Sequence, residues 1–123
     1  MKNLVFRTNR LIERMEGKEY RPDFIFEQYK NNGGWAGDWE GRTILSLVSL
    51  KKASGIEPKY LNEIIEMVYK EVNDLGYFGE IYRNGEINEQ QMAGNSWFLR
   101  GMCEYYQLVG ERPALELIER IVN

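Results

Sequence analysis

Aromatic and charged side chains gather in a glycine-rich stretch, residues 33–42, directly before an apolar run. The chemically active members of this stretch are Trp35, Asp38, Trp39, Glu40 and Arg42. Glycine lets a backbone turn tightly or approach a ligand, tryptophan offers a flat face with one donor, and carboxylates suit the first turn of a helix. The pattern predicts a binding loop that leads into a buried helix.

A second group of similar side chains precedes and opens a later apolar segment. It consists of Tyr82, Glu86, Glu89, Gln90 and Trp97. We expect the two apolar segments to be helices that run in the same direction, so both groups should lie on one rim. Aromatic faces beside carboxylates suit hydroxyl-rich ligands such as sugars. A glycosidase also needs two carboxyl groups about 5 to 10 Å apart, a distance that no sequence contains.

The polar members of both groups also have purely structural explanations. The N-terminus of a helix alone accounts for Asp38 and Glu40, because its dipole and its unpaired N–H groups favour carboxylates. Glu86 suits the solvated tip of a hairpin. Glu89 and Gln90 suit the first turn of a helix.

The tryptophans and arginines also have both structural and ligand-binding explanations. We expect Trp39 and Trp97 to pack in the core, whereas Trp35, set among glycines, is the better candidate for a ligand contact. Arg42 and Arg100 lie on otherwise apolar segments. They should pair with carboxylates from other elements, because a buried guanidinium requires partners.

Composition limits the classes of function. The 123 residues suit one domain, and a net charge of -3 with a pI near 5.1 gives no basic surface for nucleic acid. The chain has no histidine, so acid–base chemistry would fall to carboxylates or tyrosines, and we expect neither a metal site nor a cofactor. We interpret Cys103, the single cysteine, as a small apolar residue in a reducing, cytoplasmic compartment. No apolar run suggests a signal peptide or a membrane partner.

Hydrophobic periodicity and stop signals predict helices joined by short turns. Asn84-Gly85 between short alternating segments is a strong signal for a β-hairpin. The predicted elements are helices over 3–16, 38–53, 58–75, 89–109 and 113–122, a connector over 20–32, and a β-hairpin over 80–87. The helices over 38–53 and 89–109 are apolar around most of their circumference, so we expect both in the interior.

An internal repeat relates the two halves of the chain. Gly55 and Gly110 are 55 residues apart, as are Pro58 and Pro113. Each unit is therefore an interior helix, a Gly-x-x-Pro turn and an amphipathic outer helix that runs back. Units of this kind are typical of an α/α solenoid or toroid, because neither buries its inner helix alone. We predict a single all-α domain over 1–123, an array of antiparallel helical hairpins that forms part of an α/α toroid.

Several motifs resemble the N-terminal part of six-hairpin α/α-toroid glycoside hydrolases, most of all the β-L-arabinofuranosidase type. The similarity extends over most of the chain, and its motifs are residues 35–42, 76–79, 89–101 and 104–106, with Gly110. The resemblance implies a role in glycosidic bond hydrolysis and a glycoside or oligosaccharide as ligand. The family's catalytic cysteine, its zinc site and its glutamate acid come from sequence beyond the matched span. The catalytic residues of this chain therefore stay unknown.

This sequence departs from the family at the start of its first inner helix. Where family members often carry Gly-His-x-x-Gly-His, the matching positions hold Gly37, Asp38, Gly41 and Arg42. Either substrate recognition differs from that of the family, or the similarity is to a neighbouring family.

Two functional classes follow from these observations. The first is a carbohydrate-active segment of a glycoside hydrolase, inactive by itself, with Trp35, Asp38, Trp39, Glu40, Arg42, Glu86, Glu89, Gln90 and Trp97 as substrate-binding residues. The second is a helical interaction module that docks a second copy or the remaining part of a toroid. An incomplete toroid should leave Leu45, Val48, Phe98 or Tyr106 partly bare, and a bare apolar patch calls for a partner.

Overall fold

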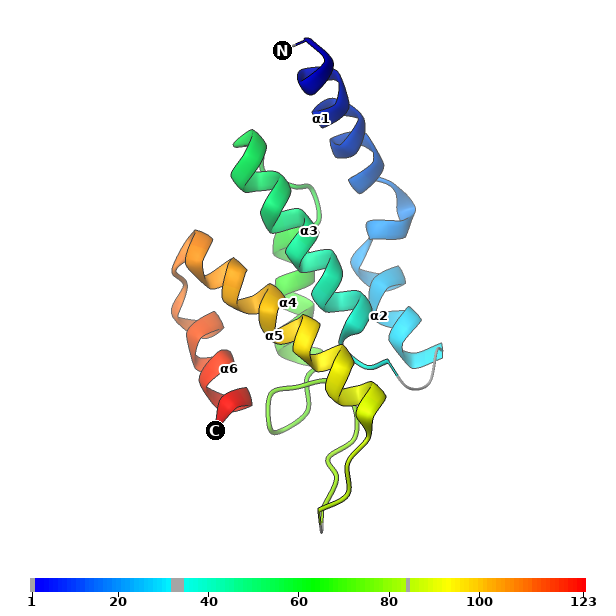
Figure 1. The fold of residues 1–123 in the computed structure, drawn as a ribbon, viewed down its shortest axis with the longest axis vertical. Coiled ribbons are helices and arrows are strands. Elements are labelled where there is room, and N and C mark those ends of the chain that lie inside the picture. The colour runs from blue at the N-terminus through cyan, green and yellow to red at the C-terminus, as the bar shows by residue number, and fades with distance from the viewer. Residues whose placement is uncertain (1, 32–34, 84) are drawn as a thin grey trace.

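The described residues, 2–31, 35–83 and 85–123, form an all-helical domain (Figure 1). In this computed structural model the elements are α1 (Lys2–Met15), the 3₁₀ turn η1 (Lys18–Tyr20), α2 (Pro22–Asn31), α3 (Asp38–Ser54), α4 (Leu61–Glu71), α5 (Glu89–Val109) and α6 (Arg112–Val122). No strand occurs in these ranges, and none of their helices is long and apolar enough to cross a membrane. The predicted all-α class is confirmed.

The two inner helices, α3 and α5, lie side by side and run in the same direction (Figure 1). Glycines allow their close approach. A Cβ on Gly41 would overlap the backbone of Trp97 and Phe98, and a Cβ on Gly101 would lie 2.8 Å from the carbonyl oxygen of Gly41. At the far end of the pair, Lys52 Nζ donates to Glu104 Oε2 over 2.6 Å. The parallel orientation expected from the repeat is therefore confirmed.

Apolar side chains from α2 to α6 and the loop before α5 enclose one core. Within it, the ring of Phe78 packs against Phe26 and Phe98, with centroids 5.9 and 4.8 Å apart. The fully buried hydrophobic residues of this core include Ile25, Ile44, Leu47, Val48, Leu61, Ile64, Val68, Phe78, Phe98, Met102 and Ala114.

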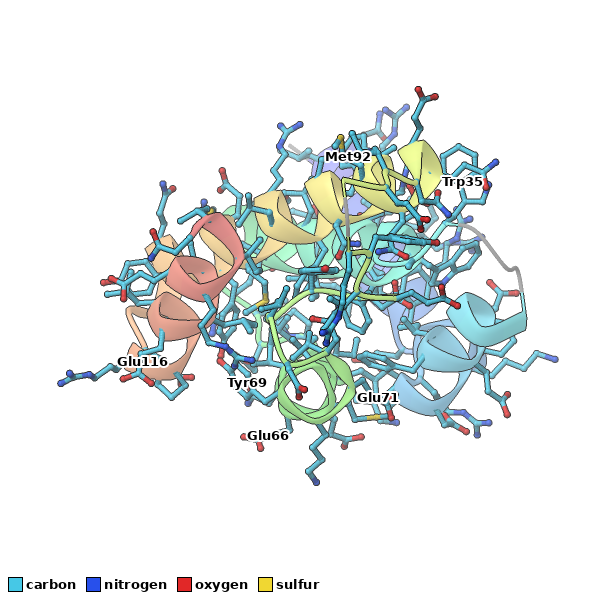
Figure 2. All side chains as sticks on the ribbon, turned by 90° about the horizontal axis from the view of Figure 1, so that it is seen from below. Trp35, Glu66, Tyr69, Glu71, Met92 and Glu116 are labelled. Carbon is cyan, nitrogen blue, oxygen red and sulfur yellow. The ribbon has the colours of Figure 1, made fainter. Side chains whose placement is uncertain are left out.

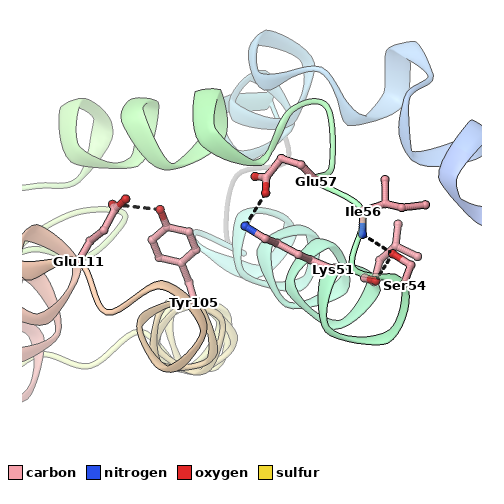
Figure 3. Close-up of polar contacts among 7 residues, drawn as sticks. Lys51, Ser54, Ile56, Glu57, Tyr105 and Glu111 are labelled. Carbon is pink, nitrogen blue, oxygen red and sulfur yellow. Dashed lines mark hydrogen bonds and ion pairs between the residues drawn. The ribbon is translucent and has the colours of Figure 1, made fainter.

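The two Gly-x-x-Pro turns are built alike, which supports the predicted repeat. Gly55 and Gly110 end α3 and α5 in the left-handed conformation, with φ of 72° and 66°. Their N–H groups donate to carbonyl oxygens four residues earlier, over 2.8 and 2.7 Å. Figure 3 shows the side-chain contacts that brace the two turns, an ion pair of Lys51 with Glu57 and a hydrogen bond from Tyr105 to Glu111.

Two predicted elements need correction in their extent. The expected connector over 20–32 contains helix α2, which Pro22 opens because its fixed φ suits the first helical position. Ile25 and Phe26 anchor this helix in the core, whereas the side chain of Tyr29 lies outside the described residues. The helix expected over 58–75 is shorter, since α4 begins at Leu61 and ends at Glu71.

The predicted β-hairpin over 80–87 is wrong for the residues that the structure describes, since none of them is in a strand. Amide side chains take the place of a strand partner along the loop that leads to α5. Gln91 bonds both the N–H and the carbonyl of Glu80, and Asn73 donates to the carbonyl of Gly79. Backbone groups satisfied in this way do not need a ladder. Asn84, part of the hairpin signal, lies outside the described residues.

Candidate functional site

The N-terminal ends of α3 and α5 meet at one end of the inner helix pair. A Cβ on Gly37 would lie 2.9 Å from Asn95 Oδ1, and a Cβ on Gly94 would overlap the carbonyl of Ala36. The prediction that the starts of the two inner helices lie next to each other is thus confirmed. Gly33 and Gly34, which open the glycine-rich stretch, lie outside the described residues.

Arg42 links two of the predicted site residues at this end. Its Nε donates to Asp38 Oδ1 over 3.0 Å, and its guanidinium carbon lies 4.4 Å from the centroid of the Trp97 ring. Arg100 is also near this ring, at 5.7 Å. The expected pairing of Arg42 with a carboxylate from another element is wrong, since Asp38 lies one turn earlier on the same helix and the side chain of Arg42 is exposed rather than buried. Trp97 is half-buried beside two cations, which leaves less of its ring for a ligand.

A hollow of about 260 Å³ opens beside the exposed flank of α3. Trp39, Arg42, Thr43 and Ser46 of α3 line it, together with Arg14 of α1 and with Glu19 and Tyr20 of η1. The residues around this small space therefore carry two aromatic rings, two guanidinium groups, one carboxylate and three hydroxyls. This arrangement can stack against a flat ligand and exchange hydrogen bonds with several hydroxyls.

Five of these lining residues were missed in the sequence. Arg14, Glu19 and Tyr20 belong to elements that only tertiary packing brings to α3, so no local pattern marks them. Thr43 and Ser46 do have a signal, because residues four and seven positions after Trp39 share its helix face.

The exposure of the tryptophans differs from expectation. Trp39 is 44% exposed, so the prediction that it packs in the core is wrong. Trp35 is 50% exposed and lies at the periphery near the start of α5 (Figure 2). Of these two indoles, only that of Trp39 lines the hollow.

Glu40 is fully buried, in contrast to its expected place on an accessible rim. It shares a face of α3 with the buried residues Ile44 and Leu47, because these positions are four and seven residues apart from it. Among the described residues, neither carboxylate oxygen has a hydrogen-bond partner. Burial raises the pKa of Glu40 to about 7; the nearby backbone N–H groups of Glu40 and Gly37 oppose this rise, and the charge of Asp38 adds to it. Glu40 is therefore an interior carboxyl group rather than a ligand contact.

Glu86, Glu89 and Gln90 are exposed, and none of them lines the hollow. The structure thus places Asp38, Trp39, Arg42 and Trp97 around one neighbourhood and separates Glu40 from it by burial. Among the described residues, no three acidic or cysteine side chains form a group that could hold a metal ion.

Comparisons with protein-family models, with curated proteins and with solved structures find no match for this chain.

Proposed function

We propose that this chain binds carbohydrate at the hollow beside α3, as the opening hairpins of an α/α-toroid glycoside hydrolase. The observation that carries the proposal is the convergence of Trp39 and Tyr20 with guanidinium, carboxylate and hydroxyl groups on one small space. Aromatic faces cover the apolar faces of a sugar ring, and the polar groups bind its hydroxyls. A volume of about 260 Å³ suits one sugar unit rather than a long chain.

The described residues that line the hollow lack the pair of carboxyl groups that hydrolysis of a glycosidic bond requires. Glycosidases place two carboxyl groups on opposite sides of the bond that they cleave. Among the described residues that line the hollow, Glu19 carries the only carboxylate, since Glu40 is buried elsewhere. We therefore expect the 123-residue chain to bind a glycoside weakly without cleaving it.

Tryptophan fluorescence tests the proposal directly. The chain is titrated with arabinose-containing oligosaccharides, and calorimetry confirms each dissociation constant. We expect Trp39→Ala to weaken binding by about tenfold or more, because the variant loses the largest aromatic face of the hollow. Trp35→Ala is the matched control, since Trp35 is 50% exposed, close to the 44% of Trp39, but does not line the hollow. Equal losses in the two variants, or no binding by the parent chain, would reject this site.

A helical interaction module is the second candidate, and one observation favours it. Helix α1 has no buried residue, and its exposed apolar side chains include Leu4 at 66%, Phe6 at 62% and Leu11 at 46%. Leu4 and Leu11, seven residues apart, share one face of α1, and exposed apolar side chains of this kind are typical of a surface that another protein covers. Light scattering on the parent and on a Leu4→Ser, Leu11→Ser variant distinguishes the candidates. An oligomer that these substitutions dissociate, without sugar binding by the parent, would favour the module.

A further inference from the structure

The inner helices are covered more completely than an incomplete toroid was expected to allow. Val48 and Phe98 are fully buried. Of the four residues expected to be partly bare, only Leu45 and Tyr106 are half-buried. A more exposed set of apolar side chains lies at the start of α1.

The first turns of α1 carry three successive apolar residues. Leu4, Val5 and Phe6 are 66%, 59% and 62% exposed. Among the exposed large apolar residues of the described ranges, no other two are adjacent in the sequence. Figure 1 shows this part of α1 at one end of the molecule, beyond the end of α3. We call Leu4, Val5 and Phe6 the apolar tip.

The three side chains of the apolar tip point in different directions. Successive residues of an α-helix are turned by about 100° around its axis, so Phe6 lies on nearly the opposite side from Leu4. A protein partner that packs against a helix covers one face of it. Such a partner would cover Leu4 together with Leu11 and would leave Phe6 in water. The interfacial layer of a lipid bilayer surrounds an inserted segment, so it can cover all three side chains at once.

Cations accompany the apolar tip, and carboxylates do not. Residues 2–11 include Lys2, Arg7 and Arg10, and the first acidic residue along the chain is Glu13. This basic segment contrasts with the net charge of -3 on the whole chain. Cations next to exposed apolar side chains on a helix favour the surface of an anionic membrane, because its headgroups attract each of them.

The contacts of this segment are compatible with a bilayer surface. Among the described residues, none of the three cations forms an ion pair, so all three are available to phosphate groups. The guanidinium carbon of Arg10 lies 5.8 Å from the centroid of the Phe6 ring. Long basic side chains can keep their charge at the headgroups while an apolar neighbour enters more deeply. The hydroxyl of Thr8 donates to the carbonyl of Leu4 over 2.9 Å, so it does not enter an apolar layer unpaired.

We propose that the start of α1 docks on an anionic phospholipid bilayer, with the apolar tip at the boundary between headgroups and acyl chains and the three cations at the phosphates. The prediction of no membrane partner rested on the lack of a long apolar run. A helix that binds the surface of a bilayer does not need such a run. This inference concerns where the chain binds and does not depend on the proposed sugar site.

Sedimentation with lipid vesicles tests the role of charge. One set of vesicles is pure phosphatidylcholine, and the other is an equal mixture of phosphatidylcholine and phosphatidylserine. We expect the parent chain to bind the mixed vesicles about tenfold or more tightly than the neutral ones. Arg7→Gln should weaken binding to the mixed vesicles about fivefold. Arg112→Gln, which removes an exposed cation of α6, is the matched control and should bind like the parent.

Phe6→Ser tests the insertion of the apolar tip. We expect it to weaken binding to the mixed vesicles about tenfold, because an inserted ring loses its apolar surroundings. Ile87→Ser is the matched control, since Ile87 is 70% exposed but lies in the loop before α5, far from the apolar tip (Figure 1). Both variants should keep the melting temperature of the parent, because both side chains are exposed.

Several results would overturn the proposal. These are a parent chain that binds neither kind of vesicle or binds both equally, and a Phe6→Ser variant that binds like the parent or no worse than Ile87→Ser. A dimer of the parent that Leu4→Ser dissociates and Phe6→Ser preserves, without binding to vesicles, would assign this part of α1 to a second copy and would also overturn it.

Discussion

The two inner helices begin in different ways, although they occupy equivalent places in the repeat. Asn88 caps α5 by accepting a hydrogen bond from the N–H of Gln91, over 3.0 Å, and Asn95 binds the N–H and carbonyl of Phe78. Helix α3 begins at Asp38, and the preceding residue Gly37, which has a φ of 85°, provides no side-chain cap. In α3 the residue equivalent to Asn95 is Glu40, whose carboxylate oxygens have no hydrogen-bond partner in the part of the chain that the structure describes.

This difference shows that equivalent positions of the two inner helices serve two purposes. In the second hairpin an uncharged amide ties the preceding loop to the helix, and its polar atoms are satisfied. In the first hairpin a carboxyl group is desolvated, and no side chain among the described residues donates a hydrogen bond to it, which costs stability. The start of α5 is therefore stabilised by its polar contacts, whereas the start of α3 depends on its packing against α5.

The strongest test of that dependence is Gly41→Ala. The new Cβ would overlap the backbone of Trp97 and Phe98, so α3 and α5 must separate. We expect a loss of about 4 kcal/mol in the free energy of unfolding, at the upper end of single substitutions. Urea denaturation measures the loss. Ser96→Ala, at the equivalent position of α5, is the control and should change stability by less than about 0.5 kcal/mol. A mild effect of Gly41→Ala would contradict the close approach of the helices.

The second test concerns the charge of Glu40. In the folded state the pKa of Glu40 is about 7, whereas in the unfolded chain it has its ordinary value of 4.5. Between pH 4.5 and about pH 7 the carboxyl group is therefore protonated in the folded state and ionised in the unfolded state. The stabilisation is therefore fully present below about pH 4.5 and is lost as pH rises to about 7. A difference of this size corresponds to up to about 3 kcal/mol.

Glu40→Gln should remove this dependence. Relative to the parent, we expect the variant to gain up to about 3 kcal/mol in unfolding free energy at pH 8 and little at pH 4.5. Denaturation at a series of pH values measures the gain. Glu63→Gln, on the exposed side of α4, makes the same change of charge without burial. If both variants respond alike to pH, a partner satisfies Glu40 and the contrast with Asn95 disappears.

The third test removes the side chain of Asn95, whose hydrogen bonds stabilise the start of α5. Asn95→Ala removes the two hydrogen bonds that Asn95 makes with the N–H and carbonyl of Phe78, a fully buried residue. We expect a loss of about 2 to 3 kcal/mol, measured by thermal and urea unfolding. Asn95→Asp keeps the acceptor for the N–H but loses both donors, so its loss should remain substantial. Full stability in the aspartate variant would show that the donors contribute nothing.

Sequence patterns within single segments were sufficient to predict the two inner helices. Apolar periodicity with Gly55 and Gly110 as stops predicted α3 and α5 almost to the residue, because positive-φ glycines end helices. The predicted β-hairpin is absent at Glu80 because the amide of Gln91, in the first turn of α5, binds the N–H and carbonyl groups that a strand partner would have bound. The hollow was only partly predictable, since Arg14 and Tyr20 reach it through tertiary packing.

Glu40 shows most directly how the sequence misled. A carboxylate in the first turn of a helix suits the dipole, and that favourable local explanation concealed its place on the buried face with Ile44 and Leu47. The helical spacing of Glu40, Ile44 and Leu47 was sufficient to predict that Glu40 is buried. Its lack of a hydrogen-bond partner depends on surrounding elements, so no pattern along the chain could have predicted it.

The substitution with the smallest expected effect tests the side-chain cap that α5 has and α3 lacks. Asn88→Ala removes the bond to the N–H of Gln91 and should cost about 1 kcal/mol of unfolding free energy. It should also loosen the contacts of Gln91 with Glu80, because both depend on the first turn of α5. Hydrogen exchange measures this local loss as faster exchange at Glu80. Exchange should stay unchanged at the start of α3, which has no such cap; equal acceleration at both starts would mean that the two helices open as one unit.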